Sequence, residues 1–227
     1  MRPYVVINAA MSADGKISTR ERRQVKISGT QDFTRVDRLK AGCDAVMVGI
    51  GTVLADDPSL TVKSEDCRRI RIDRGTDEHP IRVVVDSRAR TPPTASVLHK
   101  GPGKRVIAVS KLADENRVTE LRNHATVIVA GEEEVDLRML LMNLAELGIQ
   151  RLMVEGGGTL IAGLISAGLV DEIYTFIGNI LIGGKDAPTL VDGPGWVNET
   201  DFCRLILIEA HRMDNGILLH WKAGLPE

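Results

Sequence analysis

Three consecutive glycines, Gly156, Gly157 and Gly158, stand between an apolar run that ends at Glu155 and a helix-forming segment that begins at Thr159. Glycine has no Cβ atom, so its backbone can approach a ligand closely, and the free N–H groups at a helix N-terminus attract anions. A strand that turns through glycines into a helix is therefore suited to hold a cofactor phosphate. A tight turn without a ligand explains the same residues, so this pattern alone leaves both interpretations open.

A second pattern lies in segment 48–58, where a strand end leads into a short helical turn and then into Asp56, Asp57 and Pro58. It differs from the Gly-x-Gly-x-x-Gly dinucleotide fingerprint, because Leu54 stands where that fingerprint has its third glycine. The two carboxylates could face a ligand or could cap a turn of the loop, and both roles stay open.

A third pattern covers segment 8–17, where a buried strand is expected to end in small residues before a turn. Ala9 and Ala10 leave room for a flat ring beside the strand end. Asp14 and Gly15 form a common turn signature, which on its own carries no function.

The fourth pattern is the pair Ser87 and Arg88, which follows the expected strand 81–86 and offers a hydroxyl and a guanidinium. Ligands of open α/β sheets bind at the carboxyl ends of the strands. All four patterns fall at such ends, so we expect a single crevice to collect them.

Other chemistries find no support in the sequence. The five histidines lack metal-ligand spacing, and neither a Gly-x-Ser-x-Gly nucleophile turn nor a Gly-x4-Gly-Lys-Ser/Thr phosphate loop is present. The three cysteines are odd in number and widely spaced, which argues against a disulfide framework or a Cys-x-x-Cys metal clamp. We therefore expect no metal site, and a reducing compartment.

The elements that must position these residues follow from the hydrophobic pattern. Short β-branched runs alternate with segments of helical period, which is typical of parallel strands joined by helical crossovers. The expected strands are 4–9, 45–49, 81–86, 105–109, 126–130 and 151–155. The expected helices are 32–41, 114–123, 137–147 and 159–167, the last with Gly168 as its C-terminal cap.

The last third of the chain has a different pattern. Expected strands 172–178, 202–211 and 216–221 follow one another without long helices between them, which indicates an antiparallel edge. Long loops are expected at 11–27, 58–80 and 183–198. We predict one α/β domain over 1–227, with a mostly parallel central sheet, helices on both faces and an antiparallel C-terminal edge.

Charge and composition narrow the class of partner. The 29 Lys and Arg residues against 31 Asp and Glu residues give a net charge of -2, which favours a small molecule over nucleic acid or an anionic membrane. A basic cluster at Arg20, Arg22, Arg23 and Lys26 is most simply a solvated loop. No apolar run reaches the roughly 18 residues that a membrane span needs, and no leader pattern opens the chain, so a cytoplasmic protein is expected.

Taken together, four ordered motifs resemble the riboflavin-pathway reductase family, and the resemblance covers nearly the whole chain. They are Asn-Ala-Ala-Met-Ser-Ala-Asp-Gly-Lys-Ile at 8–17, Gly-Ile-Gly-Thr-Val-Leu-Ala-Asp-Asp-Pro at 49–58, Val-Asp-Ser at 85–87 and Val-Glu-Gly-Gly-Gly at 154–158. The resemblance implies a dihydrofolate-reductase-like fold, NADPH as hydride donor, with NADH as a second donor left open, and reduction of a ribosyl group to a ribityl group on a pyrimidine ribosylamine 5′-phosphate.

Many bacterial members of this family carry a zinc deaminase domain with His-x-Glu and Pro-Cys-x-x-Cys motifs, and this chain has neither. It looks like the free-standing archaeal and fungal type, which reduces the 2,5-diamino-pyrimidinone phosphate before deamination. The alternatives are reduction of the deaminated pyrimidinedione, less plausibly of dihydrofolate, or a non-catalytic nucleotide-binding domain. The resemblance also implies a homodimer, with segment 173–182 as the expected seam.

Site residues follow from the resemblance together with the four patterns. Expected cofactor contacts are Ala10, Thr52, Asp56, Ser87, Arg88, Gly156, Gly157, Gly158 and Thr159, with Arg88 facing the 2′-phosphate. Expected substrate contacts are Asn8, Asp14, Lys16, Lys40, Leu60, Lys63 and Glu155. Bacterial members often carry Arg at the positions of Lys40 and Lys63, and a lysine binds phosphate as a point charge without the fork of Arg.

Hydride transfer requires the nicotinamide C4 atom near the sugar C1′ atom, and the protein contributes orientation more than covalent chemistry. We hypothesise that the ribosylamine opens to an imine, and that Asp56 or Glu155 supplies a proton to the developing amine. Capping of loop amides is the alternative role for both carboxylates.

Overall fold

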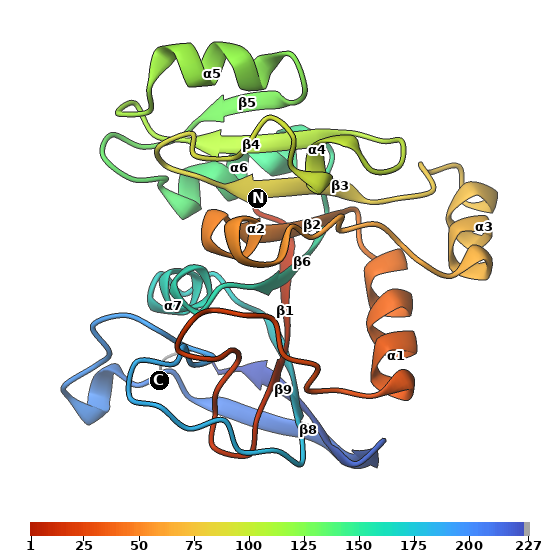
Figure 1. Ribbon diagram of the computed structural model, residues 1–227, viewed down its shortest axis with the longest axis vertical. Coiled ribbons are helices and arrows are strands. Elements are labelled where there is room, and N and C mark those ends of the chain that lie inside the picture. Colours follow the sequence, from red (N-terminus) through yellow and green to blue (C-terminus); the bar gives the residue numbers. More distant parts are fainter. Residues whose placement is uncertain (225–227) are drawn as a thin grey trace.

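The computed structural model describes residues 1–224 as an α/β domain around one nine-stranded sheet, ordered β5-β4-β3-β2-β6-β1-β7-β9-β8 (Figure 1). The strands are β1 Tyr4–Met11, β2 Ala45–Gly49, β3 Ile81–Val85, β4 Arg105–Val109, β5 Thr126–Val129, β6 Arg151–Gly156, β7 Glu172–Ile177, β8 Leu205–Met213 and β9 Gly216–Ala223. All nine were expected from the sequence, with shifts of a few residues at their ends.

All pairings among the seven strands from β5 to β7 are parallel, whereas β9 pairs antiparallel with both β7 and β8. The predicted parallel sheet with an antiparallel edge is therefore confirmed. The edge is shorter than expected, because β7 joins β1 in parallel. The helix that precedes β7 crosses over the sheet and returns the chain in the same direction.

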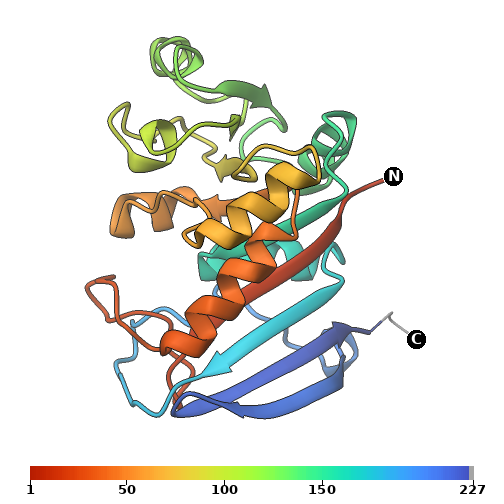
Figure 2. The ribbon, with the colours of Figure 1, turned by 90° about the vertical axis from the view of Figure 1, so that its right-hand side faces the viewer.

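Helices cover both faces of the parallel part of the sheet (Figures 1 and 2). One apolar core lies under α6 and α7, and a second lies under α1, α2, α4 and α5. The helices are α1 Thr30–Ala41, α2 Ile50–Asp56, α3 Glu65–Asp73, α4 Ser96–His99, α5 Glu115–Arg122, α6 Leu137–Glu146, α7 Gly158–Ser166 and the short 3₁₀ turn η1 Glu199–Asp201. No helix in residues 1–224 is long and apolar enough to cross a membrane.

The expectation of an uninterrupted loop over 58–80 is wrong, because α3 lies inside it. The Ser64 hydroxyl caps the first turn by accepting a hydrogen bond from the Cys67 amide at 3.4 Å. Glu65 and Asp66 follow, and acidic residues stabilise the positive end of a helix. The helix buries little apolar surface, so its hydrophobic pattern was too weak to predict it.

The loops at 11–27 and 183–198 meet each other beside the end of β1. An isolated antiparallel bridge joins Lys16 to Thr189, and the Ile17 amide donates to the Pro188 carbonyl at 3.0 Å. The basic cluster in the first of these loops is exposed, as expected of a solvated loop. The two long loops thus close over one end of the sheet.

The β8–β9 hairpin is the least covered part of the sheet. No α-helix lies over it in either ribbon view (Figures 1 and 2). Four consecutive apolar side chains of β8 are between 41% and 56% exposed, namely Leu205, Ile206, Leu207 and Ile208. This hairpin is therefore a free apolar edge.

Candidate active site

The four sequence patterns come together, because the strands that carry them are neighbours. In the sheet order β3-β2-β6-β1, each adjacent pair is parallel, and Val48 of β2 pairs with Gly156 of β6. Their carboxyl ends therefore lie at the same edge of the sheet. The four patterns therefore lie at one edge of the sheet, as expected, and their lining of a single crevice stays a prediction.

The glycine turn after β6 has a backbone that only glycine adopts easily. Gly156 has a φ of 141°, and Gly157 has a φ of 48° with a ψ of 135°. A Cβ atom added to Gly157 would lie 3.4 Å from the Thr52 hydroxyl oxygen, so α2 packs directly beside the turn. These two glycines leave bare backbone facing Thr52.

Gly158 has a different role from the two glycines before it. A Cβ atom at this position would meet the Thr189 carbonyl at 2.4 Å and the Asp192 carboxylate at 2.9 Å. The Asp192 amide also donates to the Gly158 carbonyl at 3.2 Å. Gly158 is thus required by contact with the second long loop, which covers the start of α7.

Both helices at this edge begin without a side-chain cap. Gly49 precedes α2 and Gly157 precedes α7, so the first N–H groups of these helices have no cap side chain to which they can donate. The first N–H groups of a helix need a partner. Two uncapped helix starts beside bare glycine backbone make an environment suited to an anion.

The neighbouring acids Asp56 and Asp57 differ in environment. Asp57 accepts hydrogen bonds from the Ser96 amide and hydroxyl, both at 2.7 Å, and these bonds lower the pKa of its carboxyl. Burial raises the pKa of Asp56, the last residue of α2. The capping role considered for this pair is therefore filled by Asp57, and Asp56 is the carboxyl that retains its proton more readily.

After β3, the acidic and hydroxyl side chains are mostly engaged within the protein. The buried Asp86 carboxylate accepts from the Thr91 amide and hydroxyl, both at 2.7 Å. The Ser87 hydroxyl accepts from the Val135 amide at 3.0 Å. Arg88 is exposed and makes one long hydrogen bond of 3.4 Å to a carbonyl, so its guanidinium is available to a ligand.

Directly before the glycine turn, Glu155 of β6 forms an ion pair with Lys40 of α1. Their Nζ and Oε1 atoms lie 2.9 Å apart, and the two side chains are only 10% and 17% exposed. Both residues were predicted from the sequence to contact the substrate. The structure brings them into direct contact, although 115 positions separate them in the sequence.

Helix α1, which carries Lys40, is fastened at both ends. At its start, the Asp214 carboxylate accepts from the Gln31 and Asp32 amides at 3.1 and 3.0 Å. At its end, the buried Arg71 guanidinium donates to the Ala41 and Cys43 carbonyls at 2.9 and 2.7 Å. These contacts fix the position of Lys40.

Lys63 lies close to this ion pair. Its ammonium donates to the Ser59 and Thr61 hydroxyls at 2.7 and 2.9 Å. Burial lowers the pKa of Lys63, and the charges of Lys40 and Lys100 lower it further. Several ammonium groups near one another favour an anion in the same place.

Other predicted substrate residues are engaged in holding the local structure. The Leu60 side chain is 3% exposed and belongs to a core, so only the backbone of Leu60, with a φ of 54°, can face a ligand. The Asn8 amide oxygen accepts from Arg35 at 2.5 Å. Ala10, two positions further along β1, is half-buried.

Asp14 and Lys16 join the two long loops. The Asp14 carboxylate accepts from the Ser12 hydroxyl at 2.6 Å and from the Ile182 and Gly183 amides at 3.0 and 2.7 Å, which lowers its pKa to about 2. The Lys16 ammonium donates to the Ala187 carbonyl at 3.0 Å. Their polar atoms bind protein groups and shape the two loops, and their contact with substrate stays a prediction.

Two contributors to this region were missed in the sequence analysis. Asp214 lies in the β8–β9 turn and Lys100 follows α4, and neither stands in a motif.

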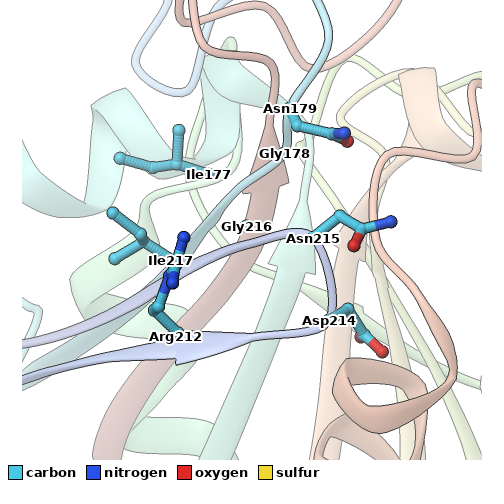
Figure 3. A pocket seen from close by; sticks show the side chains of 8 residues that line it. All are labelled: Ile177, Gly178, Asn179, Arg212, Asp214, Asn215, Gly216 and Ile217. Carbon is cyan, nitrogen blue, oxygen red and sulfur yellow. The ribbon is translucent and has the colours of Figure 1, made fainter.

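A separate hollow of about 720 Å³ lies beside Asp214, at the end of β7 and the β8–β9 turn (Figure 3). None of the predicted site residues lines this hollow. Among residues 1–224, no group of three or more His, Cys, Asp or Glu side chains is arranged to hold a metal ion.

Comparison with known proteins shows the family to which this chain is related. Residues 3–219 match the family model described as the RibD C-terminal domain. A 2,5-diamino-6-ribosylamino-4(3H)-pyrimidinone 5′-phosphate reductase of Archaeoglobus fulgidus is 53% identical over 92% of this chain and 94% of its own length. A reductase of the same name from Methanothermobacter thermautotrophicus is 48% identical over 97% of this chain and 98% of its own length.

Among solved structures, Acinetobacter baumannii RibD has a TM-score of 0.80 at 26% identity. The match covers 98% of this chain and 58% of that chain, so the present sequence spans little more than half of that protein. These findings confirm the expected resemblance to riboflavin-pathway reductases and the dihydrofolate-reductase-like fold. The chain belongs to the RibD C-terminal domain family.

Proposed function

We propose that this protein uses NADPH to reduce the ribosyl group of 2,5-diamino-6-ribosylamino-4(3H)-pyrimidinone 5′-phosphate. One observation carries the proposal. The uncapped glycine turn and the Lys40–Glu155 ion pair lie at the same edge of the sheet, and Lys63 lies beside the ion pair. The names of the archaeal relatives, at 53% and 48% identity, support this substrate.

The cofactor is proposed to bind at the glycine turn, where no side chain covers the backbone. The starts of α2 and α7 and the turn at Gly156 and Gly157 would hold its pyrophosphate, because their N–H groups lack side-chain partners. The exposed Arg88 would face the 2′-phosphate and so favour NADPH over NADH. When bound, the cofactor supplies a hydride.

The substrate is proposed to bind on the lysine side. Glu155 would accept hydrogen bonds from the sugar or the pyrimidine, with Lys40 holding its carboxylate in place. Lys63 would contribute positive charge for the 5′-phosphate. Both partners would then lie over the same strand ends, which brings the reacting carbon atoms close to each other.

Asp56 is our candidate proton donor in place of Glu155. Its carboxyl has a raised pKa because of burial, so it holds a proton at higher pH than an ordinary aspartate does. The Glu155 carboxylate is already engaged by the Lys40 ammonium at 2.9 Å. The nitrogen of the opened ribosylamine would accept the proton from Asp56 as the carbon is reduced.

The test is NADPH oxidation by the purified protein, with the diamino-pyrimidinone and its deaminated counterpart supplied separately. Turnover of the diamino compound alone supports the proposal. Preference for the deaminated compound would assign the protein to the alternative substrate. NADPH binding without oxidation of either compound would favour a nucleotide-binding domain.

The homodimer is proposed to form through β8 and not through the expected seam at 173–182. Strand β7 is paired on both sides, so it offers no free edge, whereas β8 pairs only with β9 and exposes four consecutive apolar side chains. Replacing Leu207 by Glu should yield monomers in size-exclusion chromatography with light scattering. Ile72→Glu, on the exposed face of α3, should leave the mass unchanged.

The cytoplasm is the proposed compartment. Cys43, Cys67 and Cys203 are all free thiols in the structure, and the first two are buried. Free cysteines are compatible with a reducing environment.

A further inference from the structure

Lys100 lies near enough to Lys63 for its charge to act on that ammonium, and contacts from three parts of the chain hold its backbone. It follows α4, whose first residue Ser96 is held by the Asp57 carboxylate. The Lys100 amide donates to the Ser96 carbonyl at 2.9 Å, and the Lys100 carbonyl accepts from the buried Arg82 guanidinium. The backbone of this lysine is therefore fixed, while its side chain is exposed.

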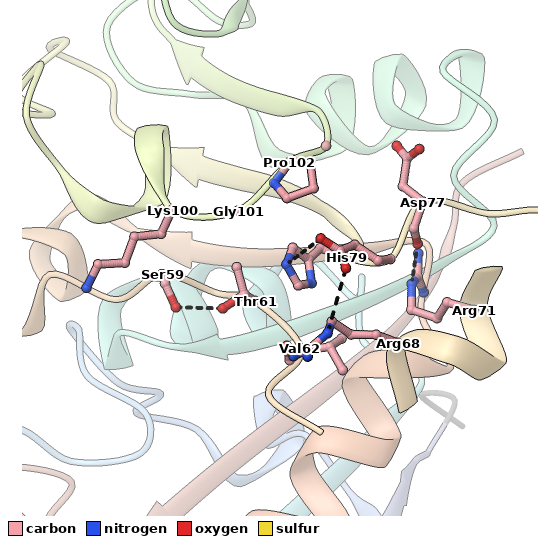
Figure 4. A network of polar contacts seen from close by, with 12 residues as sticks. Ser59, Thr61, Val62, Arg68, Arg71, Asp77, His79, Lys100, Gly101 and Pro102 are labelled. Carbon is pink, nitrogen blue, oxygen red and sulfur yellow. Dashed lines mark hydrogen bonds and ion pairs between the residues drawn. The ribbon is translucent and has the colours of Figure 1, made fainter. Parts of the chain in front are cut away.

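The next residue brings this loop against the segment that carries Lys63. Gly101 has a φ of 70°, and a Cβ atom there would lie 2.7 Å from His79 and 3.3 Å from the methyl carbon of Thr61. Only glycine allows this close approach. In Figure 4, Lys100 leaves this loop above the Ser59 and Thr61 hydroxyls, which are the two groups that hold the Lys63 ammonium.

The carboxylates of the region are already engaged. Glu155 is paired with Lys40, Asp37 accepts from the Lys63 and Ser64 amides at 2.8 and 2.7 Å, and Asp57 accepts from Ser96. Within residues 1–224, no carboxylate oxygen lies within 4.0 Å of the ammonium of Lys63 or of Lys100. Two neighbouring ammonium groups without an ion-pair partner repel each other unless an anion binds between them.

We propose that Lys100 is a specificity-determining residue that binds the 5′-phosphate of the substrate together with Lys63. The inference rests on the proposed function, since it assigns one further contact within the same site. Phosphate has three free oxygens, so Lys63 with its two hydroxyls and Lys100 can bind different oxygens. Lys100 then discriminates a phosphorylated ribosylamine from its dephosphorylated form.

The experiment compares Lys100→Ala with Lys104→Ala, an exposed lysine in the same loop, on the phosphorylated substrate and on its dephosphorylated counterpart. Lys100→Ala should lower kcat/KM about tenfold for the phosphorylated substrate and leave the dephosphorylated one and the KM for NADPH unchanged. Lys104→Ala should change neither substrate, and Lys100→Arg should restore most of the loss. Equal effects of Lys100→Ala on both substrates, or no effect on either, would overturn the proposal.

A second measurement separates this inference from the proposed function. Inorganic phosphate should raise the Tm of the wild-type protein and of Lys104→Ala more than it raises that of Lys100→Ala, at matched ionic strength. If the wild-type protein reduces neither pyrimidine but shows this difference, the proposed function fails and the phosphate site stands. If all three proteins respond equally to phosphate, Lys100 does not bind it.

Discussion

The proposed site has a cofactor side and a substrate side, and the two are built from different parts of the protein. The cofactor side consists of backbone: the glycine turn after β6 and the uncapped starts of α2 and α7. The substrate side consists of charged side chains from distant segments, namely Lys40, Lys63 and Glu155. The first side depends on backbone conformations that glycine adopts most easily, and the second depends on charges held close together, of which only the Lys40–Glu155 pair is nearly buried. The same kind of substitution should therefore have different consequences on the two sides.

Asp56 is the proposed proton donor, and its replacement should have the largest effect on turnover. Asp56→Asn removes the proposed proton donor, so kcat should fall about 100-fold or more, as is typical for general acids. The KM for NADPH should change little. Asp57→Asn is the matched control, because Asp57 serves as a cap, and it should lower Tm more than kcat. An unchanged kcat in Asp56→Asn would remove this residue from the mechanism.

The same variant has a predicted pH signature. The folded-state pKa of Asp56 is raised by burial, so its contribution to stability is fully present below the unfolded pKa of about 3.9 and is lost as pH rises through the folded value. Asn carries no charge. Asp56→Asn should therefore be slightly more stable than wild type at pH 8, with the gain shrinking toward pH 4 in thermal unfolding experiments.

On the substrate side, breaking the Lys40–Glu155 pair should cost stability as well as activity. Glu155→Gln leaves a nearly buried ammonium without its partner, which should lower the free energy of unfolding by about 2–4 kcal/mol. Adding Lys40→Met should recover part of that loss, although not the activity. Urea denaturation of the two single variants and the double variant measures the coupling.

The exposed Lys111–Glu132 ion pair is the control for burial. Glu132→Gln removes the partner of Lys111, where the two side chains are 64% and 75% exposed, and it should change stability by less than about 1 kcal/mol. If Glu132→Gln and Glu155→Gln lowered the free energy of unfolding equally, burial would not explain the contribution of the Lys40–Glu155 pair.

On the cofactor side, Gly157→Ala should act through backbone strain. Its φ of 48° and ψ of 135° cost a side-chain-bearing residue about 1–3 kcal/mol. The turn should therefore shift, and the KM for NADPH should rise roughly tenfold. Gly168→Ala, at a φ of 65° with open space around it, is a control that should lower Tm and leave the KM for NADPH unchanged.

Arg88→Ala should give the smallest effect. The side chain is exposed, so its attraction to a 2′-phosphate is partly screened by solvent, and the KM for NADPH should rise by less than about tenfold. The KM for NADH should stay constant, and Arg69→Ala, on the exposed surface of α3, should alter neither. Equal changes for both cofactors would argue against recognition of the 2′-phosphate by Arg88.

Features with a local sequence signal could be predicted, whereas features that depend on contacts between distant segments could not. The strands were predicted because apolar, β-branched runs mark buried parallel strands, and the glycine turn was predicted because its signal is local. Helix α3 was missed, since Ser64 and two acids start it with little apolar pattern. Lys100 and Asp214 were missed because their roles depend on contacts with segments that lie far away in the chain. Likewise, the three consecutive glycines did not indicate that Gly158 contacts the second long loop, whereas Gly156 and Gly157 face Thr52.

The separation of the two sides can be tested in one set of initial rates. Wild type, Gly157→Ala and Lys63→Ala would be assayed with NADPH varied at saturating pyrimidine substrate, and then with the pyrimidine substrate varied at saturating NADPH. We expect Gly157→Ala to raise only the KM for NADPH and Lys63→Ala to raise only the KM for the phosphorylated pyrimidine. If either variant raised both values equally, the assignment of backbone to the cofactor and of lysines to the substrate would be wrong.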